Sequence, residues 1–572
     1  MVYVVNDPAE FAAQMQEGFC AAYPDWVRRV PGGVVRSTTV PEGQVAVVTG
    51  GGSGHYPAFA GLVGPGLAHG AALGNIFASP SAQQVYSVAK AAESGGGVLL
   101  TYGNYAGDVL NFNQAQERLR AEGIDCHTVV VTDDIASAAP EHSHQRRGIA
   151  GDLFVFKVAA AAAEAGRPLA EVVELATRAN AATRTLGVAF TGCTLPGSSE
   201  PLFTVPHGRM GVGMGIHGEP GIDEQDIPSA DELAELLVTR LLQERPEGSS
   251  GRVVVLLNGL GGVKYGELFV LYRSVARLLG EVGLEIVQPE IGELVTSFEM
   301  AGTSLTLSWL QEDLEEYWGV PANTPAYRKG SRTLGERAQI DDAELTDQHR
   351  AAHASDVSRA AGQVIARALA TTEETIDEHV HYLGELDAVA GDGDHGIGMQ
   401  RGSHAAAAAA REAAGQGGGA AGVLQAAADA WSDRAGGTSG ALWGALLTSM
   451  ATTLGDTEEV TVERLATAIS SAAEAVRTFG KVELGDKTMV DALTPFAEAF
   501  ARAADTGEDF SGATRAAAAE ARAAAEATAD LLPRAGRARP HAQKSLGTPD
   551  PGAYSFALIC QALAELATHN RK

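Results

Sequence analysis

The chain has 572 residues, of which 45% are hydrophobic and 20% are charged, and its formal net charge is -29. This length exceeds what one hydrophobic core usually serves, and the composition excludes a largely disordered chain. The acidic balance argues against nucleic acid or an anionic membrane as a partner, because both favour basic surfaces.

The four cysteines form no CxxC pair, so the sequence predicts neither a zinc site nor a redox motif. Isolated cysteines are typical of a reducing cytoplasm. The N-terminus lacks the basic and apolar regions of a signal peptide, and no stretch is apolar over the length of a membrane span. We therefore expect a soluble, cytoplasmic protein.

The first half alternates β-rich runs with Gly-rich turns and helical patterns. Helical patterns lie at 81–94 and 153–166. The order predicts an α/β domain over 1–328 with a largely parallel sheet, in which ligands bind beyond the carboxyl ends of the strands. The predicted strands, rich in Val, Leu and Thr, are at 44–50, 97–103, 126–134 and 252–259.

The composition changes after a polar segment at 329–349, which predicts a linker. Beyond it, strand-like runs nearly vanish and the chain becomes rich in alanine. The segment 350–572 is therefore predicted to be an all-α domain whose small side chains let the helices pack closely. The strongest helical patterns lie at 403–414, 422–435, 462–479 and 514–532.

The segment GGGSGHYP at 50–57 follows a predicted strand. Its glycines permit tight curvature and expose backbone N–H groups, which suits an oxygen-rich or anionic ligand. His55, near its end, could donate a hydrogen bond or transfer a proton. The residues alone favour a tight turn with a surface histidine over this interpretation. No Gly-Lys-Ser/Thr follows, so the segment is not a Walker A loop.

Two further polar residues lie in glycine-containing segments. Asp108 follows a predicted strand, where a carboxylate can accept a proton from a substrate hydroxyl. By itself, a helix cap for a segment beginning at Val109 is the simpler interpretation. His217 lies between glycines in GMGIHGEPG, where a neutral imidazole can attack a carbonyl carbon. A satisfied loop histidine is the simpler interpretation there, and the absence of a following helical pattern excludes a dinucleotide fingerprint.

Three aspartates crowd among glycines in LDAVAGDGDHGIGM, namely Asp387, Asp392 and Asp394. Carboxylates this close repel one another unless a cation neutralises them. Oxygen ligands favour Mg²⁺, which usually keeps substrate phosphates among its ligands. A calcium loop is the alternative, but Gly398 or Ser403 stands where the EF-hand needs its glutamate. We therefore expect an Mg-nucleotide site rather than a calcium site or a plain turn.

Two more segments of the second half could bind phosphate. GGTSGALWG begins a predicted helix with Thr438 and Ser439 at its head, where N–H groups can hold a phosphate. A capped helix start is the alternative, and the two are compatible. Further on, Arg537, Arg539 and Lys544 form a basic cluster in an acidic chain. This cluster suggests a phosphate-facing lid, with an exposed loop as the alternative.

Together these motifs resemble single-chain dihydroxyacetone kinases over nearly the whole sequence. The first half carries GGGSGH, NYAGDVLNF, RRGIAG, GIHGEPG, NGLGG and EMAGTSLTL. The second half carries the three aspartates, GGTSGAL, GDKTMVDAL and DPGA. Each motif is weak by itself, but their order and distribution are specific. The resemblance implies an α/β domain that holds a ketose and an all-α helical barrel that binds ATP at one end.

For the first half, the resemblance implies that His217 forms a covalent hemiaminal with the substrate carbonyl. Such a bond would distinguish ketones and aldehydes from polyols such as glycerol. Asp108 would be the general base on the terminal hydroxyl, and His55 would assist by hydrogen bonding. The residues that would line the sugar are Gly52, Ser53, Gly54, His55, Asp108 and His217.

For the second half, the resemblance implies that Asp387, Asp392 and Asp394 hold two Mg²⁺ ions that bridge the phosphates of ATP. The metals would neutralise charge on the transferring group and orient it. The family is typically dimeric, so we expect a homodimer. The residues expected around the nucleotide are His395, Gly396, Thr438, Ser439, Gly485, Arg537 and Asp550.

The sequence departs from the common family pattern near the sugar pocket. Tyr56 replaces the usual glutamate of GGGSGHEP, and Gly103 replaces the lysine before NYTGD. Both departures resemble the erythrulose kinase branch, so the resemblance implies a four-carbon ketose, with dihydroxyacetone as the alternative. Neither the enantiomer nor the hydroxyl that is phosphorylated follows from the sequence. The segment GRARP also differs from the common GRASY near the lid.

Two other functions fit the same fold. Some relatives take phosphate from a phosphotransferase protein and hold ADP permanently, but their two domains are usually separate chains. A ligand-binding transcriptional co-regulator is the second alternative. Relatives of that kind lack the covalent histidine or the metal aspartates, whereas this chain has both. A side activity that splits FAD leaves no sequence signature.

Overall fold

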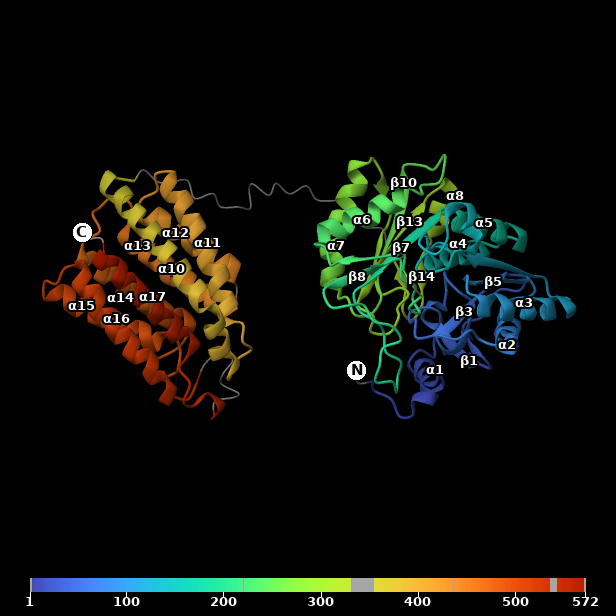
Figure 1. Ribbon diagram of the computed structural model, residues 1–572, viewed down its shortest axis with the longest axis horizontal. Coiled ribbons are helices and arrows are strands. Elements are labelled where there is room, and N and C mark those ends of the chain that lie inside the picture. The colour runs from blue at the N-terminus through green and yellow to red at the C-terminus, as the bar shows by residue number, and fades with distance from the viewer. Residues whose placement is uncertain (1–2, 220, 331–353, 436, 535–542, 570–572) are drawn as a thin grey trace. The chain divides into compact units, whose positions relative to one another are not determined.

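The computed structural model describes residues 3–219, 221–330, 354–435, 437–534 and 543–569. The chain divides into two compact units, Met1–Glu336 and Arg337–Lys572. The first unit is α/β, and within its described residues the second contains helices and no strands (Figure 1). These findings confirm the predicted fold class. Most of the predicted linker at 329–349 lies outside the described residues.

The first sheet of unit 1 has six strands in the order β1-β2-β4-β3-β5-β6. The strands β4, β3, β5 and β6 pair in parallel, whereas β1 and β2 extend the edge in antiparallel. β3 and β5 are buried along their whole length, as expected for continuous apolar runs between two layers of helices. The strands are β1 (Val27–Val30), β2 (Gly33–Arg36), β3 (Ala46–Ser53), β4 (Gly70–Ile76), β5 (Val98–Gly103) and β6 (Cys126–Val131).

Helices cover both faces of this sheet. The helices α2 (Ala82–Ala92) and α3 (Ala106–Ala121) pack on one face. The helices α4 (Asp152–Glu164) and α5 (Leu169–Ala181) pack on the other face, against a core that the second sheet shares. α3 begins directly after β5, so its first turn lies at the carboxyl edge of the sheet, where we expected ligands to bind.

The second sheet is mainly antiparallel, which corrects the prediction of a largely parallel arrangement. β13 lies between β10 and β7 and is antiparallel to both, while the short strands β11 and β12 run parallel to β10. The alternation of strands and helices along a sequence does not predict which strands pair in the sheet. The strands are β7 (Thr183–Ala189), β8 (Arg209–Val212), β9 (Asp223–Asp226), β10 (Arg252–Gly259), β11 (Glu285–Ile286), β12 (Glu290–Gly292) and β13 (Gly302–Trp309).

The other elements of unit 1 close its core. Leu-rich stripes of α6 (Ala230–Leu242) and α7 (Tyr265–Glu281) pack on one face of the second sheet. α8 (Glu312–Gly319) packs against α4 on the opposite side. The remaining elements are α1 (Phe11–Ala22), the hairpin of β14 (Ala322–Asn323) and β15 (Arg328–Lys329), and short 3₁₀ turns at Pro8–Glu10, Ala60–Leu62 and Pro140–Gln145.

The described part of unit 2 contains eight α-helices, which form a closed ring, and a 3₁₀ turn at Thr528–Asp530. Each helix packs against the next one along the chain, and α17 returns to α10. Alanine faces permit this close packing, and the ring encloses an apolar cavity of about 620 Å³. The helices are α10 (Asp356–Ala388), α11 (His395–Gly415), α12 (Ala420–Ala435), α13 (Gly437–Leu454), α14 (Val462–Gly480), α15 (Val490–Asp505), α16 (Phe510–Ala527) and α17 (Pro551–His569).

The cysteines and the apolar helices complete the description of the fold. Cys20, Cys126, Cys193 and Cys560 are free thiols. In the part of the chain that the structure describes, no helix combines the length and the apolar character needed to cross a membrane.

Candidate active site

His55 and His217 meet beyond the carboxyl end of β3. Only 2% of His55 is exposed, and its Nδ1 donates to the carbonyl oxygen of Thr296 at 2.7 Å. Its Nε2 lies 2.9 Å from Nε2 of His217, which stands 162 positions further along the chain. Burial, together with the His217 charge, lowers the pKa of His55 to about 3. His55 is therefore a buried neutral imidazole, and the interpretation as a surface histidine is wrong.

His217 lies in the loop between β8 and β9 and is the more accessible ring, with 23% of its side chain exposed. Its Nδ1 contacts Oε1 of Glu219 at 3.0 Å. Burial would raise the pKa of Glu219, but the hydrogen bond and charge of His217, with Arg147 nearby, outweigh it and lower that pKa to about 2. Glu219 is therefore an anion, and it faces an imidazole whose other nitrogen points toward His55.

Asp108 lies in the first turn of α3. The helix begins at Ala106, so the interpretation that made Asp108 a cap for a helix beginning at Val109 is wrong. The side chain is buried, and among the described residues its Oδ1 has no hydrogen-bond partner. Burial raises the pKa of Asp108 to about 6, against the lowering effects of a Ser79 hydrogen bond and the His217 charge. This unpartnered oxygen can accept a hydroxyl proton.

The glycine loop forms the wall behind His55. A Cβ on Gly54, whose φ is 105°, would lie 2.9 Å from the rings of Phe77 and Phe298, so only glycine fits there without displacement. The Ser53 hydroxyl donates to the Gly74 carbonyl oxygen at 2.7 Å. The Ser53 proton is thus used inside the fold, and the backbone of this segment is what a ligand can contact.

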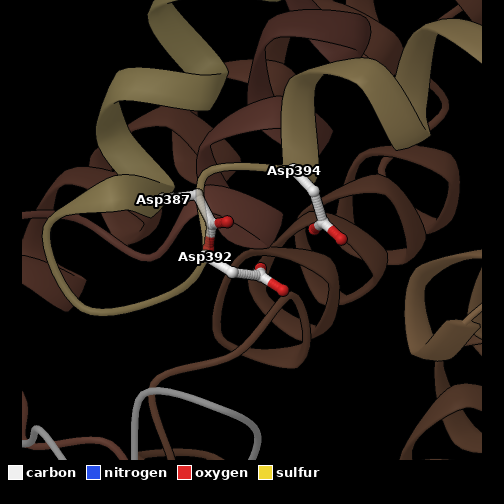
Figure 2. A group of neighbouring side chains, drawn as sticks. All are labelled: Asp387, Asp392 and Asp394. Atoms are coloured by element: carbon white, nitrogen blue, oxygen red, sulfur yellow. The ribbon is translucent and has the colours of Figure 1, made fainter. Parts of the chain in front are cut away.

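In unit 2, the carboxylates of Asp387, Asp392 and Asp394 converge on one point (Figure 2). One oxygen from each lies within 4.8 Å of the others. Asp387 belongs to the last turn of α10, and the other two belong to the loop before α11. The Gly393 N–H donates to Asp387 Oδ2 at 2.9 Å, which orients this carboxylate. Three hard oxygen donors at this spacing fit a divalent cation such as Mg²⁺.

His395 and Gly396 open α11 directly after the aspartates. His395 Nε2 lies 3.0 Å from the Ser555 hydroxyl of α17, and burial lowers the pKa of His395. A Cβ on Gly396 would stand 2.0 Å from the carbonyl oxygen of Val380, so glycine permits the close approach of α10 and α11. These contacts tie the aspartate loop to its neighbouring helices.

A second loop, between α14 and α15, contains Gly485. Asp491 accepts hydrogen bonds from the Gly485 N–H at 2.6 Å and from the Thr488 N–H at 2.7 Å, which closes the loop. Asp550 precedes α17 and accepts from the Ala553 N–H at 2.8 Å. Burial of its carboxyl group and the Asp491 charge raise the pKa of Asp550 to about 7.

Thr438 and Ser439 lie in the first turn of α13, as predicted for the head of a helix. An open groove of about 640 Å³ begins at Gly437 and is lined by small side chains and Phe479. Arg537, the remaining residue predicted to contact the nucleotide, lies outside the described residues.

Some residues that contact the candidate site had no role in the sequence analysis. Glu219 and Arg147 lie within quoted motifs, but their effect on His217 depends on contacts between separate segments. Lys487 also lies in a quoted motif, GDKTMVDAL, and its buried ammonium group holds two backbone carbonyls. In each case the sequence showed a charged residue inside a glycine-containing motif, but it did not show which residue that charge would contact.

Comparisons with known proteins agree with this two-unit architecture. The Dak1 domain model matches residues 17–326, and the DAK2 domain model matches residues 389–565. The chain is 58% identical to an L-erythrulose kinase of Pectobacterium atrosepticum, over 99% of this chain and 96% of that one. It is 53% identical to a D-erythrulose kinase of Mycolicibacterium smegmatis, over 99% of both chains.

A solved structure extends this similarity to the fold. The dihydroxyacetone kinase of C. freundii in complex with AMP-PNP and Mg²⁺ matches with a TM-score of 0.60 and 30% identity, over 99% of both chains. The same two kinds of unit therefore follow one another in both chains. The chain is a kinase of the dihydroxyacetone kinase family, in the form that joins a Dak1 domain and a DAK2 domain in one polypeptide.

Proposed function

We propose that this protein transfers the terminal phosphoryl group of ATP to a terminal hydroxyl of a small ketose, with erythrulose as the preferred substrate. The observation that carries the proposal is the His55–His217 contact of 2.9 Å in the same unit as a buried carboxylate, Asp108, that has an unpartnered oxygen. The full-length similarity to D- and L-erythrulose kinases supports the choice of ketose but leaves the enantiomer to experiment.

In this proposal His217 holds the ketose as a covalent hemiaminal. Its Nε2 bonds to the carbonyl carbon, which a polyol such as glycerol does not have. The His217 ring is accessible, which suits covalent capture, and the His55 ring is buried, which suits hydrogen bonding. The backbone of Gly52, Ser53 and Gly54 would line the sugar. Covalent capture would therefore select ketones and aldehydes before any phosphate is transferred.

Asp108 would remove the proton from the terminal hydroxyl as phosphate is transferred. Its raised pKa, about 6, keeps it ionised near neutral pH while making it a stronger base than an exposed aspartate. Asp108 lies in the first turn of α3, where the positive end of the helix dipole favours the anion.

The three aspartates of unit 2 would bind two Mg²⁺ ions together with the phosphates of ATP. Such ions neutralise the phosphate charge and align the group for transfer. The chain would supply the carboxylates and the helix starts: His395 and Gly396 at α11, Thr438 and Ser439 at α13, with Gly485, Asp550 and Arg537 around the nucleotide. The groove beginning at Gly437 is the proposed place of the adenine ring.

The proposed preference for erythrulose rests more on the similarity to erythrulose kinases than on Tyr56 and Gly103, the two departures from the common family pattern. The ring of Tyr56 lies 6.0 Å from that of Phe19, on the side of α1. A Cβ on Gly103 would lie 3.0 Å from the carbonyl oxygen of Gly148. Both residues therefore pack against the surrounding elements of unit 1, and they would affect the shape of the pocket through those elements.

A homodimer is also part of this proposal, and sedimentation velocity tests it.

The decisive assay measures ADP formation with Mg-ATP and five acceptors: dihydroxyacetone, D-erythrulose, L-erythrulose, glyceraldehyde and glycerol. We expect the highest kcat/KM with one erythrulose and no turnover with glycerol. Preference for dihydroxyacetone would discard the substrate but keep the chemistry. No turnover by folded protein would overturn the proposal. Nucleotide that stays bound through dilution would instead point to a phosphotransferase donor, and ketose binding without turnover to a co-regulator.

A further inference from the structure

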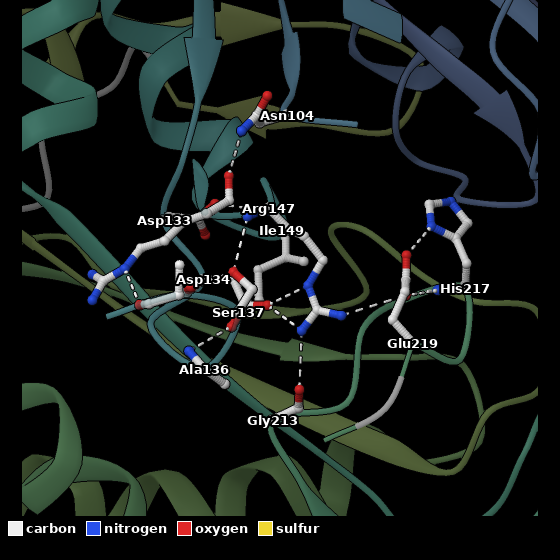
Figure 3. Close-up of polar contacts among 12 residues, drawn as sticks. Asn104, Asp133, Asp134, Ala136, Ser137, Arg147, Ile149, Gly213, His217 and Glu219 are labelled. Carbon is white, nitrogen blue, oxygen red and sulfur yellow. Dashed lines mark hydrogen bonds and ion pairs between the residues drawn. The ribbon is translucent and has the colours of Figure 1, made fainter. Parts of the chain in front are cut away.

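A chain of charged side chains ends at His217 and crosses three segments of unit 1 (Figure 3). The Arg147 guanidinium contacts Asp134 Oδ2 at 2.7 Å and Glu219 Oε2 at 3.8 Å. The other oxygen of Glu219, Oε1, lies 3.0 Å from His217 Nδ1. Arg147 also donates to the Gly213 carbonyl oxygen at 3.1 Å. Each charge therefore lies beside an opposite charge, and the last link is the imidazole proposed to capture the ketose.

Further contacts hold this series of charged side chains in place. Asp134 is buried, and it also accepts a hydrogen bond from the Ala136 N–H at 3.0 Å. A Cβ on Gly215 would stand 2.0 Å from Glu219 Oε2 and 2.6 Å from Arg147 Nη1. The glycine two residues before His217 thus leaves the space in which the arginine and the glutamate meet. The contact with Arg147, in the space that Gly215 leaves, positions Glu219 more precisely than an exposed ion pair could.

The hydrogen bonds of the two histidines require three protons. The Thr296 carbonyl can only accept, so Nδ1 of His55 carries a proton. The ionised Glu219 can only accept, so Nδ1 of His217 carries a second. The Nε2–Nε2 contact of 2.9 Å needs a third between the rings. Two neutral imidazoles together carry only two, so the pair holds one positive charge. His55 is the more deeply buried ring, so the geometry places the charge on the side of His217, beside Glu219.

We propose that Glu219, anchored by Arg147, is a positioning residue that keeps the His55–His217 pair singly charged, so that the proton between the rings passes to the ketose oxygen during capture. This inference rests on the proposed function. It adds Glu219 and Arg147 to the residues on which ketose capture depends. It also gives a source for the proton that the hemiaminal hydroxyl needs.

The capture step balances in atoms and charge. The proton on His217 Nε2 moves to His55 Nε2, and the freed lone pair of His217 forms the bond to the carbonyl carbon. The π electrons of the carbonyl move to its oxygen, which takes the proton from His55. His55 is neutral again, and the substituted His217 ring keeps both its positive charge and its Nδ1 proton on Glu219. Glu219 therefore faces one positive charge before and after the reaction.

The pH dependence of capture follows from the groups around this pair. Loss of the extra proton at high pH removes the proton that the ketose oxygen needs. Glu219→Gln removes an adjacent anion that favours the protonated pair. Burial raises the pKa of Tyr105 well above its usual value, so this phenol stays neutral. The titratable and charged groups around the pair are Glu219, Arg147, Asp108 and Tyr105, and Cys193 lies near Glu219.

The test follows capture itself, without ATP. The full chain is mixed with ketose labelled with ¹³C at C2, and NMR measures how much of the carbonyl signal becomes a protein-bound tetrahedral carbon between pH 6 and 9. Three proteins are compared: wild type, Glu219→Gln and Glu224→Gln. Glu224 pairs with Arg209 at 3.2 Å on the surface, so this control removes a comparable ion pair away from the histidines.

We expect Glu219→Gln to capture at least about tenfold less ketose at pH 8, with its high-pH limb moved down by about one unit or more. The control should match wild type, and Glu219→Asp should restore part of the effect. A wild-type pH profile in Glu219→Gln would overturn the inference. In wild type, ¹⁵N NMR of labelled histidine should find three protonated nitrogens in the pair at pH 7, and two would also overturn it.

These results separate the inference from the proposed function. Wild type that neither captures any ketose nor forms ADP would contradict the proposed function. Capture and turnover by wild type, with an unaffected Glu219→Gln variant, would contradict only the role of Glu219. The nitrogen count needs no ketose and no variant, so it decides the proton arrangement even if Glu219→Gln fails to fold.

Discussion

A Cβ atom on Gly52 would lie 2.8 Å from the Cα of Phe77, so the glycine loop and the segment after β4 touch backbone to backbone. Phe77 in turn stacks on His55, with ring centroids 4.9 Å apart. The space at Gly52 therefore determines where the His55 ring lies. Phe77 has a φ of 52°, a left-handed conformation that is uncommon for residues other than glycine.

Replacing Gly52 with alanine should displace Phe77 and His55. We expect Gly52→Ala to reduce ketose capture at least about tenfold and to destabilise unit 1 by about 1–3 kcal/mol, the usual cost of overpacking. Gly18→Ala is the matched control, since a Cβ there meets nothing within 4 Å in an exposed helix. Labelled-ketose NMR and chemical denaturation measure the two effects. Undiminished capture by a folded Gly52→Ala protein would contradict the argument.

The Asp108→Asn variant should separate capture from transfer. Loss of the proposed general base should lower kcat by about 100-fold or more, while capture of the ketose by His217 should continue. Asp125→Asn provides the control, because that carboxylate is exposed. If kcat of Asp108→Asn equals that of wild type, Asp108 is not the base.

The pH profile gives a second test of Asp108. Burial raises its pKa to about 6, and the active form is the carboxylate. In wild type, kcat should therefore fall as the pH decreases through about 6. The residual activity of Asp108→Asn should lack this limb. If the decrease of kcat at low pH persists unchanged in Asp108→Asn, it comes from the titration of another group.

Removing one of the clustered carboxylates should weaken metal binding. We expect Asp392→Asn to raise the Mg²⁺ concentration for half-maximal activity at least about tenfold, while ketose capture in unit 1 is unchanged. The thermal stabilisation of wild type by Mg²⁺ with AMP-PNP should be largely lost, since it scales with binding. Asp505→Asn, an exposed aspartate at the end of α15, should behave as wild type. An unaltered Mg²⁺ response in Asp392→Asn would remove this site from the proposal.

Two lysines of unit 2 allow a matched comparison, because both have a left-handed backbone. Lys481 has a φ of 52° and is exposed, whereas Lys487 has a φ of 61° and is buried. The Lys487 ammonium donates to the carbonyl oxygens of Leu531 and Ser545 at 3.1 and 2.7 Å. It thereby ties the loop containing Gly485 to two segments that precede α17.

Lys487→Met should remove the ammonium donor from both carbonyls, and the Ser545 carbonyl would keep only the Thr548 N–H at 3.1 Å. We expect unit 2 to lose about 1–3 kcal/mol of stability and the KM for ATP to rise. Lys481→Met should change neither quantity measurably. Denaturation and ATP kinetics check both variants. Equal behaviour of the two lysine variants would show that the buried contacts of Lys487 do not support the nucleotide loop.

Local patterns in the sequence predicted much of this protein. Runs of Val, Leu and Thr marked β3, β5, β6 and β10, and alanine-rich periodicity marked the helices of unit 2. The carboxylate cluster proposed to bind metal was also readable, because Asp387, Asp392 and Asp394 lie within eight positions of one another. Each of these features depends on interactions between near neighbours in the chain, so the sequence displays them directly.

The tertiary structure decided what lies between distant segments. His55 and His217 are 162 positions apart, and their 2.9 Å contact, like the burial that neutralises His55, exists only after the two sheets pack. The same packing inserts β13 between β10 and β7 and brings Arg147 to Glu219. No local period encodes such contacts, because they depend on how whole layers pack. The sequence by itself therefore predicted which residues could take part in the proposed chemistry, and the fold decided their burial and their partners.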